Sequence, residues 1–271
     1  MLPILLILGG WVVFNNFIRP AHYQLLYPYS EFQFREFNIT ETRIGPDNRV
    51  EIRIPSGPAV TGKDLYQKEI FIDGFWIDQV PVTAADYKRF IYGRPILSPK
   101  YHDEYTPYWF NKRYELLPVV FIGWDQAEHY CEFYGGHLPT EAQWEKAARG
   151  TEGIILYWDD NEKAFDKANY DDFYKGKTFS GWLPKGKTVY GLMDMSGNVR
   201  EWGLDWVDYM DQSVKKVSWI EIKDGKHGQL GRILKGGSYI DDVSHLRLNS
   251  RDAHDPGSPG FNRGFRCVYE K

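Results

Sequence analysis

Regular helical patterning stops near residue 151 of this 271-residue chain, and that loss of pattern is the strongest constraint on its fold. Before this point the sequence carries helix start and stop signals. After it, short strand-like runs, Gly/Asp turns and Trp-rich segments dominate. Aromatic residues form 17% of the chain, and large rings can fill irregular space between short elements. The sequence predicts an α+β domain whose second half is held by buried rings, disulfides or bound cations.

Three helices are predicted from N-cap residues that precede runs of helix-forming residues: Thr83, Asp125 and Thr140. The residues three positions after Thr83 and Thr140 can bond back to the cap, which completes a capping box. The helices are expected over residues 84–91, 126–134 and 141–149. Strands are expected over residues 50–54, 70–80 and 119–122.

The first 18 residues carry no charged side chain. As a helix they would span about 27 Å, just enough to cross the hydrocarbon core of a membrane. We expect an uncleaved transmembrane anchor at residues 1–18, an aromatic connector at 19–45 and one domain at 46–271. A signal peptide is an alternative, but no basic region precedes the apolar run and no small-x-small cleavage site follows it. A buried core helix is a further alternative, which Gly9 and Gly10 fit poorly.

Three observations bear on compartment and partners. The net charge of −4 and the absence of a basic stripe argue against nucleic acid. Arg19 favours a cytoplasmic domain under the positive-inside rule. Cys131 and Cys267 could be two unrelated buried thiols, or a long-range disulfide if the domain lies in an oxidising compartment.

Five blocks occur in the order and with spacing compatible with one known family: FWIDQVPVTAADYKRFI, PVVFIGWDQAEHYCEFYGGHLPTEAQWEKAARG, YGLMDMSGNVREW, LKGGSY and GFRCV. Together they resemble the formylglycine-generating enzyme (sulfatase-modifying factor) family over about residues 50–270. The resemblance implies an irregular, loop-rich α+β fold related to C-type lectins. It also implies a structural disulfide between Cys131 and Cys267, and therefore a periplasmic or extracellular domain.

Active members of this family use two further cysteines after the GGSY block to bind copper and activate oxygen. The corresponding residues here, 240–252, contain no cysteine. Copper(I) selects soft thiolate ligands, so no copper is expected. The resemblance therefore points to a pseudoenzyme without formylglycine-generating activity, and we expect no catalytic residues.

The resemblance also implies structural calcium. At a first site it gives the carboxylates of Asp194 and Glu201 with the carbonyls of Gly197 and Val199, donors that suit calcium. A second site would use Asn169 and the carbonyl of Tyr170, although its usual acidic partner is missing. The alternative for the first site is a tight Gly-Asn turn with Glu201 in a salt bridge, and for the second a plain loop.

Polar residues gather where active members keep their reaction centre. Asp241, Asp242, His245, Asp252, His254 and Asp255 could bind a metal or act as acid and base, or could form a solvated loop. Arg247 and Arg251 could bind an anionic ligand or a partner. We expect the tryptophans Trp144, Trp202 and Trp206 to be core residues.

The expected function is a non-catalytic binding or scaffold subunit, anchored in a membrane, that docks on a larger membrane-protein complex. The connector at residues 23–37 would contribute to docking. The alternative is a divergent oxidoreductase or maturation enzyme that uses the Asp/His cluster. Carbohydrate recognition is a further option, without a supporting signature.

Overall fold

The structure is a computed structural model. It describes residues 41–62, 67–92, 112–159, 162–208, 213–215 and 230–270, together with three short strands before residue 21. The predicted docking segment, residues 23–37, lies outside the described residues.

The three N-terminal strands replace the helix predicted for residues 1–18. They are β1 (Leu6–Leu8), β2 (Trp11–Phe14) and β3 (Phe17–Pro20), paired antiparallel. In the sequence these strands are separated only by Gly9-Gly10 and Asn15-Asn16, residue types that favour two-residue hairpin turns. No helix in the described ranges is long and apolar enough to cross a membrane.

A four-stranded antiparallel sheet joins the start of the domain to its C-terminus, in the order β14-β8-β5-β4. Its strands are β4 (Thr42–Ile44), β5 (Val50–Ile54), β8 (Phe75–Asp78) and β14 (Val268–Tyr269). Strand β4 lies inside the predicted connector, so the sheet begins before residue 46. The strand predicted over residues 50–54 is confirmed.

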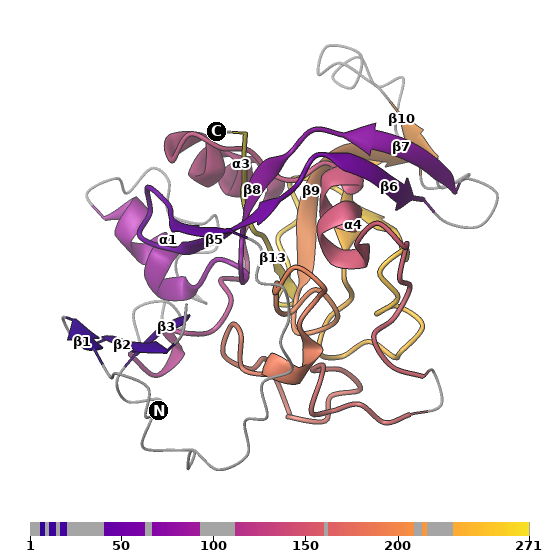
Figure 1. Cartoon of the computed structure of the whole chain (residues 1–271). Coiled ribbons are helices and arrows are strands. Elements are labelled where there is room, and N and C mark those ends of the chain that lie inside the picture. Colours follow the sequence, from indigo (N-terminus) through magenta and orange to yellow (C-terminus); the bar gives the residue numbers. More distant parts are fainter. Residues whose placement is uncertain are drawn as a thin grey trace, which may run out of the picture.

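A separate two-stranded ribbon, β6 (Gly57–Thr61) and β7 (Lys68–Ile72), extends from this sheet over helix α4 (Figure 1). The single strand region predicted over residues 70–80 is therefore two strands, β7 and β8. They are separated by Asp73-Gly74, and Gly in a strand commonly marks such an interruption.

The helices follow their predicted caps closely. Helix α1 (Ala84–Ile91) begins after Thr83 and α4 (Glu141–Arg149) after Thr140, each with a complete capping box. Helix α3 (Trp124–Phe133) begins after Gly123, so the prediction of Asp125 as its cap is wrong. Short 3-10 turns occur at η5 (Lys112–Tyr114) and η6 (Pro184–Gly186).

The strand predicted over residues 119–122 is not present. Phe121 has a φ of 60°, which interrupts the extended conformation, and its amide donates to the carbonyl of Gly260 at 2.9 Å. Val119, Val120 and Ile122 are nevertheless buried, as the prediction of a buried segment required.

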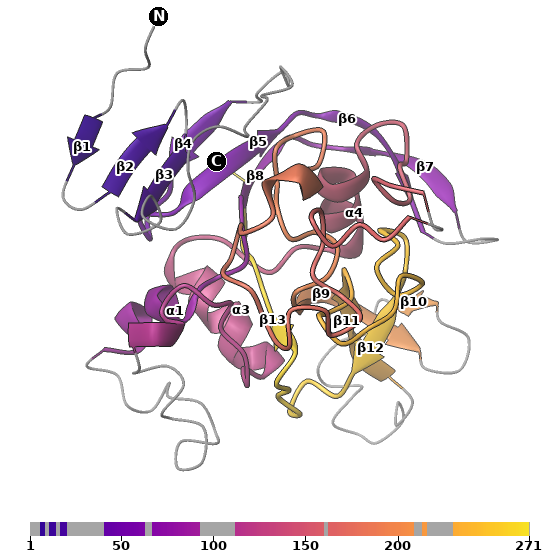
Figure 2. The ribbon, with the colours of Figure 1, turned by 90° about the horizontal axis from the view of Figure 1, so that it is seen from below.

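The second half of the chain is built on a five-stranded sheet, with long turns around it. The order is β10-β9-β11-β12, and β13 pairs with β9 in parallel. Its strands are β9 (Arg200–Asp208), β10 (Val214–Lys215), β11 (Leu230–Lys235), β12 (Asp252–His254) and β13 (Arg263–Gly264). Figure 2 shows the turns of residues 150–199 winding beside β9, β11 and β12. The described part of this half contains no α-helix, as the sequence predicted.

Two apolar layers lie on opposite faces of the first sheet. Ile52 and Ile77 pack with Trp144 of α4 in one layer, while Trp76 packs with residues of α1 and α3 in the other. The predicted disulfide is confirmed in the second layer, where Cys131 of α3 is bonded to Cys267 with an S–S distance of 2.04 Å. It closes a loop over a sequence separation of 136 residues, which contributes about 4–5 kcal/mol by chain-entropy estimates.

A buried cluster of charges ties this sheet to α1. Arg49 donates to Asp78 at 2.7 Å and lies 3.3 Å from Asp86, which belongs to α1. The other carboxylate oxygen of Asp78 is buried without a hydrogen-bond partner. Burial disfavours the ionised form and raises the pKa of Asp78 to about 8, against an ordinary value of 3.8.

This raised pKa gives stability a definite pH dependence. Between about pH 4 and 8 the folded protein keeps a proton on Asp78 that the unfolded chain releases, so this carboxyl's contribution to stability falls as the pH rises. The variant Asp78→Asn should remove that decline, as measured by urea unfolding across the range. The matched control is Asp242→Asn, because Asp242 is exposed and its pKa lies at about 2. Equal pH slopes for wild type and Asp78→Asn would contradict the assignment.

Candidate functional site

The segment after the GGSY block is occupied by structural contacts. Asp241 accepts two hydrogen bonds from Arg200, at 2.9 and 2.7 Å, and two from the amide and hydroxyl of Ser238. Arg200 also contacts Asp252. Burial opposes ionisation of Asp241, but the bonds from Arg200 and Ser238 outweigh it and lower the pKa of this carboxyl. Asp241 and Asp252 thus share one arginine and hold the turn to β9.

Asp242 and His245 form a separate contact at the surface. Nδ1 of His245 lies 3.1 Å from Oδ1 of Asp242, and the same oxygen accepts from the hydroxyl of Ser244 at 2.5 Å. The bonds from Ser244 and His245 lower the pKa of Asp242 to about 2. Because serine and histidine share one carboxylate oxygen, the three residues form a local turn and not a serine–histidine–aspartate relay.

Arg251 belongs to a buried ion-pair network centred on α4. It donates to both oxygens of Glu141, at 2.7 and 2.5 Å. Glu141 also lies 3.5 Å from Lys235, which contacts Glu145 at 2.6 Å, and Glu145 in turn accepts from Arg149 at 2.7 Å. All five of these side chains are between 0 and 8% exposed and none is available to an anionic ligand, so Arg251 has a structural role.

The remaining residues of the predicted cluster lie apart from these groups. His254 is on β12 opposite Arg232, and burial lowers the pKa of its imidazole. Arg247 is half-buried in the turn before Ser250. In the described ranges no three His, Cys, Asp or Glu side chains converge in a way that could hold a metal ion.

Asp194, in the first predicted calcium site, is a half-buried carboxylate. Its Oδ2 accepts from the amide of Gly181 at 2.6 Å, and burial raises its pKa to about 6. A bound cation would relieve this desolvation, so Asp194 fits a calcium ligand. Gly197 has a φ of 86°, and a Cβ there would lie 2.3 Å from the carbonyl oxygen of Asn169. The Gly-Asn turn therefore requires glycine.

Glu201 fits the calcium site less well, because both of its oxygens are already bound. Oε1 accepts from Arg266 at 2.7 Å, and Oε2 accepts from Arg266 at 2.8 Å and from Trp144 at 2.7 Å. Arg266 also donates to the carbonyls of Asp78, Gln79 and Met193. The salt-bridge alternative for Glu201 is thus the arrangement found here. The sequence did not lead us to select Arg266, although its position next to Cys267 indicated that it lies in the segment held by the disulfide.

The second predicted site lies beside the first. Asn169 forms a bridge with Gly197, and its side-chain nitrogen donates to the carbonyl of Gly176 at 2.9 Å. Its Oδ1 atom is buried without a hydrogen-bond partner, which fits a cation ligand. The carbonyl of Tyr170 already accepts from the amide of Phe173 at 3.1 Å. The backbone of Asn169, in the second predicted site, therefore lies beside that of Gly197, in the first.

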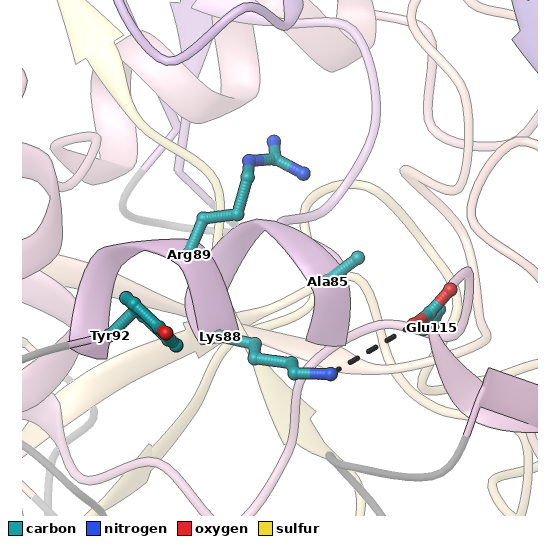
Figure 3. Close-up of a pocket in the computed structure, with 5 residues that line it drawn as sticks. All are labelled: Ala85, Lys88, Arg89, Tyr92 and Glu115. Atoms are coloured by element: carbon teal, nitrogen blue, oxygen red, sulfur yellow. Dashed lines mark ion pairs between the residues drawn. The ribbon is translucent and has the colours of Figure 1, made fainter. Parts of the chain in front are cut away.

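A surface hollow of about 390 Å³ lies along helix α1 and is lined by Ala85, Lys88, Arg89, Tyr92 and Glu115. Figure 3 shows Lys88 reaching toward Glu115, at 4.0 Å, while Arg89 leaves the helix in another direction. Arg89 itself contacts Asp86 at 2.6 Å. The hollow contains no histidine, cysteine or paired carboxylates, so we do not assign it catalytic chemistry.

Removing the charge of Glu201 should be strongly destabilising. Glu201→Gln keeps the shape but leaves the guanidinium of Arg266 buried without its counter-charge, and the free energy of unfolding should fall by about 3–5 kcal/mol. Urea unfolding measures this. The control is Glu162→Gln, because Glu162 pairs with Lys167 at 3.2 Å at the surface, where such a pair contributes about 0–1 kcal/mol. Similar losses in the two variants would show that the buried pair is not a main support.

Known proteins resemble this chain over most of its length. It is 27% identical to the formylglycine-generating enzyme of Mus musculus over 279 residues, covering 80% of this chain and 74% of that protein. It is 30% identical to serine/threonine-protein kinase pkn1 of Chlamydia pneumoniae over 217 residues, covering 76% of this chain. The chain spans about a third, 34%, of the length of that kinase.

The solved structure of PvdO from Pseudomonas aeruginosa has the same fold. The TM-score is 0.66 at 18% identity, covering 86% of this chain and 99% of PvdO. Residues 33–271 match the sulfatase-modifying factor enzyme 1-like domain. This match extends over most of the chain and includes the region around the Arg266–Glu201 pair. The chain therefore belongs to the sulfatase-modifying factor (formylglycine-generating enzyme-like) family.

Proposed function

We propose that this chain is a non-catalytic binding or scaffold subunit that is attached to a membrane and docks on a larger membrane-protein assembly. One observation carries the proposal. Residues 240–252 contain no cysteine, and polar side chains there are used to hold the fold. Asp241 holds Arg200, and Arg251 holds Glu141. Without a thiolate, copper(I) has no soft ligand in this segment.

The disulfide supports a periplasmic or extracellular location. Disulfides persist in oxidising compartments, and both cysteines of this chain are joined in one. The charge-free residues 1–18 are the proposed membrane attachment. Strands β1–β3 would leave unpaired edge groups in lipid, so a membrane-bound form of this segment would be helical. The proposed relation to C-type lectins agrees with a domain that recognises another macromolecule.

Bound calcium is part of the proposal, with a structural role. Asp194 supplies a carboxylate to the first site, which the carbonyls of Gly197 and Val199 would complete, and Asn169 supplies a side-chain oxygen to the second. Glu201 could contribute only while it keeps its bonds to Arg266 and Trp144. Calcium would offset the desolvation of Asp194 and join the two turns.

A divergent oxidoreductase or maturation enzyme is the second candidate, because of His245. Its Nδ1 is held by Asp242, an arrangement that fixes an imidazole for metal binding or proton transfer. Both side chains are more than half exposed, however, at 54 and 63%. No further carboxylate or histidine within the described ranges joins them in a metal-holding group.

The proposal is tested by activity and fractionation of the full chain. With copper and a peptide that contains a cysteine, the purified protein should form no aldehyde, as measured by mass spectrometry. Deleting residues 1–18 should move the chain from the membrane pellet to the supernatant. Aldehyde formation would overturn the non-catalytic assignment. Stoichiometric copper or iron that is lost in His245→Ala would favour the oxidoreductase.

Calcium should raise the melting temperature, because an ion that binds the folded state stabilises it by mass action. Scanning calorimetry with calcium and with a chelator measures the difference. Asp194→Asn should abolish the calcium-dependent shift, whereas the exposed control Asp166→Asn should retain it. Identical melting temperatures with calcium and chelator in the wild type would remove calcium from the proposal.

A further inference from the structure

Four large hydrophobic side chains are exposed in three segments of the chain. Phe173 and Tyr174 are 52 and 38% exposed, and Ile240 and Phe261 are 43 and 47% exposed. Single exposed apolar residues are ordinary, but a group of them marks an interaction surface more often than chance would.

Backbone and ring contacts join the segments around Phe173, Ile240 and Phe261. The amide of Asp171 donates to the carbonyl of Asp241 at 2.9 Å, and that of Asp172 to the carbonyl of Tyr239 at 2.7 Å. The ring of Tyr239 then lies 6.4 Å from that of Phe261, edge to face. The turn that carries Phe173 is thus fixed beside Tyr239. We call Phe173, Tyr174, Tyr239, Ile240 and Phe261 the aromatic patch.

The turn that presents Phe173 has an unusual backbone. Asp171, Asp172 and Lys175 have φ values of 57°, 49° and 56°, a region that non-glycine residues seldom adopt. Such conformations persist where the surrounding structure enforces them, and they concentrate at functional surfaces. Behind the exposed ring, Phe165 stacks on Phe173 at 3.9 Å and holds it rigid. A rigid aromatic side chain loses little conformational entropy on binding.

Carboxylates outnumber amines around the patch. Asp171 is exposed, and the side chains of Asp172 and Asp242 are 48 and 63% exposed. Lys175 contacts Asp172 at 3.5 Å, and Lys177 lies over the ring of Tyr239 at 5.6 Å. His245 also contacts Asp242 at 3.1 Å, and Lys177 donates to the carbonyl of Phe261 at 3.4 Å. Two lysines and one histidine therefore lie among three carboxylates. A partner with a basic side chain would complement this rim, and arginine can also stack on aromatic rings.

We propose that the aromatic patch is the docking surface for a protein segment that carries an aromatic or aliphatic anchor beside an arginine or lysine. This inference rests on the proposed function, for which it names the surface and the kind of partner. The anchor would cover Phe173 and Phe261, and the basic group would lie against Asp172 or Asp242. Rigid rings surrounded by polar groups are typical of binding hot spots.

The test uses the full chain in detergent and a phage-displayed library of random peptides. Selected peptides should combine a basic residue with an aromatic or aliphatic one. Their affinity should fall at least about tenfold in the Phe173→Ala/Phe261→Ala double variant. Asp172→Asn should weaken binding and reduce its dependence on salt. Phe71→Ala is the control, because Phe71 is 70% exposed but lies on strand β7. Unchanged thermal unfolding checks that each variant is folded.

Several outcomes would overturn the inference. These are a failure to enrich any peptide, enrichment of acidic peptides alone, and equal binding to the wild type and the double variant. Binding of neutral oligosaccharides that is lost in the double variant would also overturn it, since the partner would then be a carbohydrate. The result is separable from the proposed function: aldehyde formation would refute the non-catalytic role whether or not the patch binds, and a silent patch would leave that role intact.

Discussion

The ion pair between Arg266 and Glu201 is the interaction on which the rest of the structure depends. Both side chains are almost fully buried, and two hydrogen bonds of 2.7 and 2.8 Å join them. Arg266 also reaches the end of β8 and the turn at Met193, while Glu201 reaches Trp144 of α4. One planar guanidinium thus connects the C-terminal segment, both large sheets and the irregular second half. The disulfide at the adjacent Cys267 adds a covalent constraint to the same segment.

The same kind of contact holds the segment that follows the GGSY block. Arg251 and Lys235 meet Glu141 and Glu145 on one side of α4, and Asp241 is bound to Arg200. These charges neutralise one another in a buried setting, where an unpaired partner would be strongly unfavourable. These side-chain pairs hold residues 240–252 in place, and none of them involves sulfur. The rings of Phe173, Tyr174 and Phe261 remain exposed.

Short sequence patterns correctly predicted those elements that are determined by contacts between residues close in sequence. The capping boxes at Thr83 and Thr140 gave the starts of two helices, because cap and partner are three residues apart. Prediction was wrong where a distant contact decides the backbone, as at Phe121, whose amide bonds to Gly260. Residues 1–18 were predicted to form a helix, whereas the described parts of this segment are paired strands; an apolar run alone suits either structure.

Sequence alone determined the family, the helix starts and the absence of a cysteine in residues 240–252, because these depend on residue type and local spacing. Only the tertiary structure decided how the polar residues are used. Glu201 faces Arg266 across 65 positions, and Arg251 faces Glu141 across 110. The packing of sheets and helices determines which of these distant residues meet, and a local sequence pattern contains no information about it. Likewise, the turn that carries Phe173 is held beside Tyr239 by a backbone bond from Asp172 that spans 67 positions.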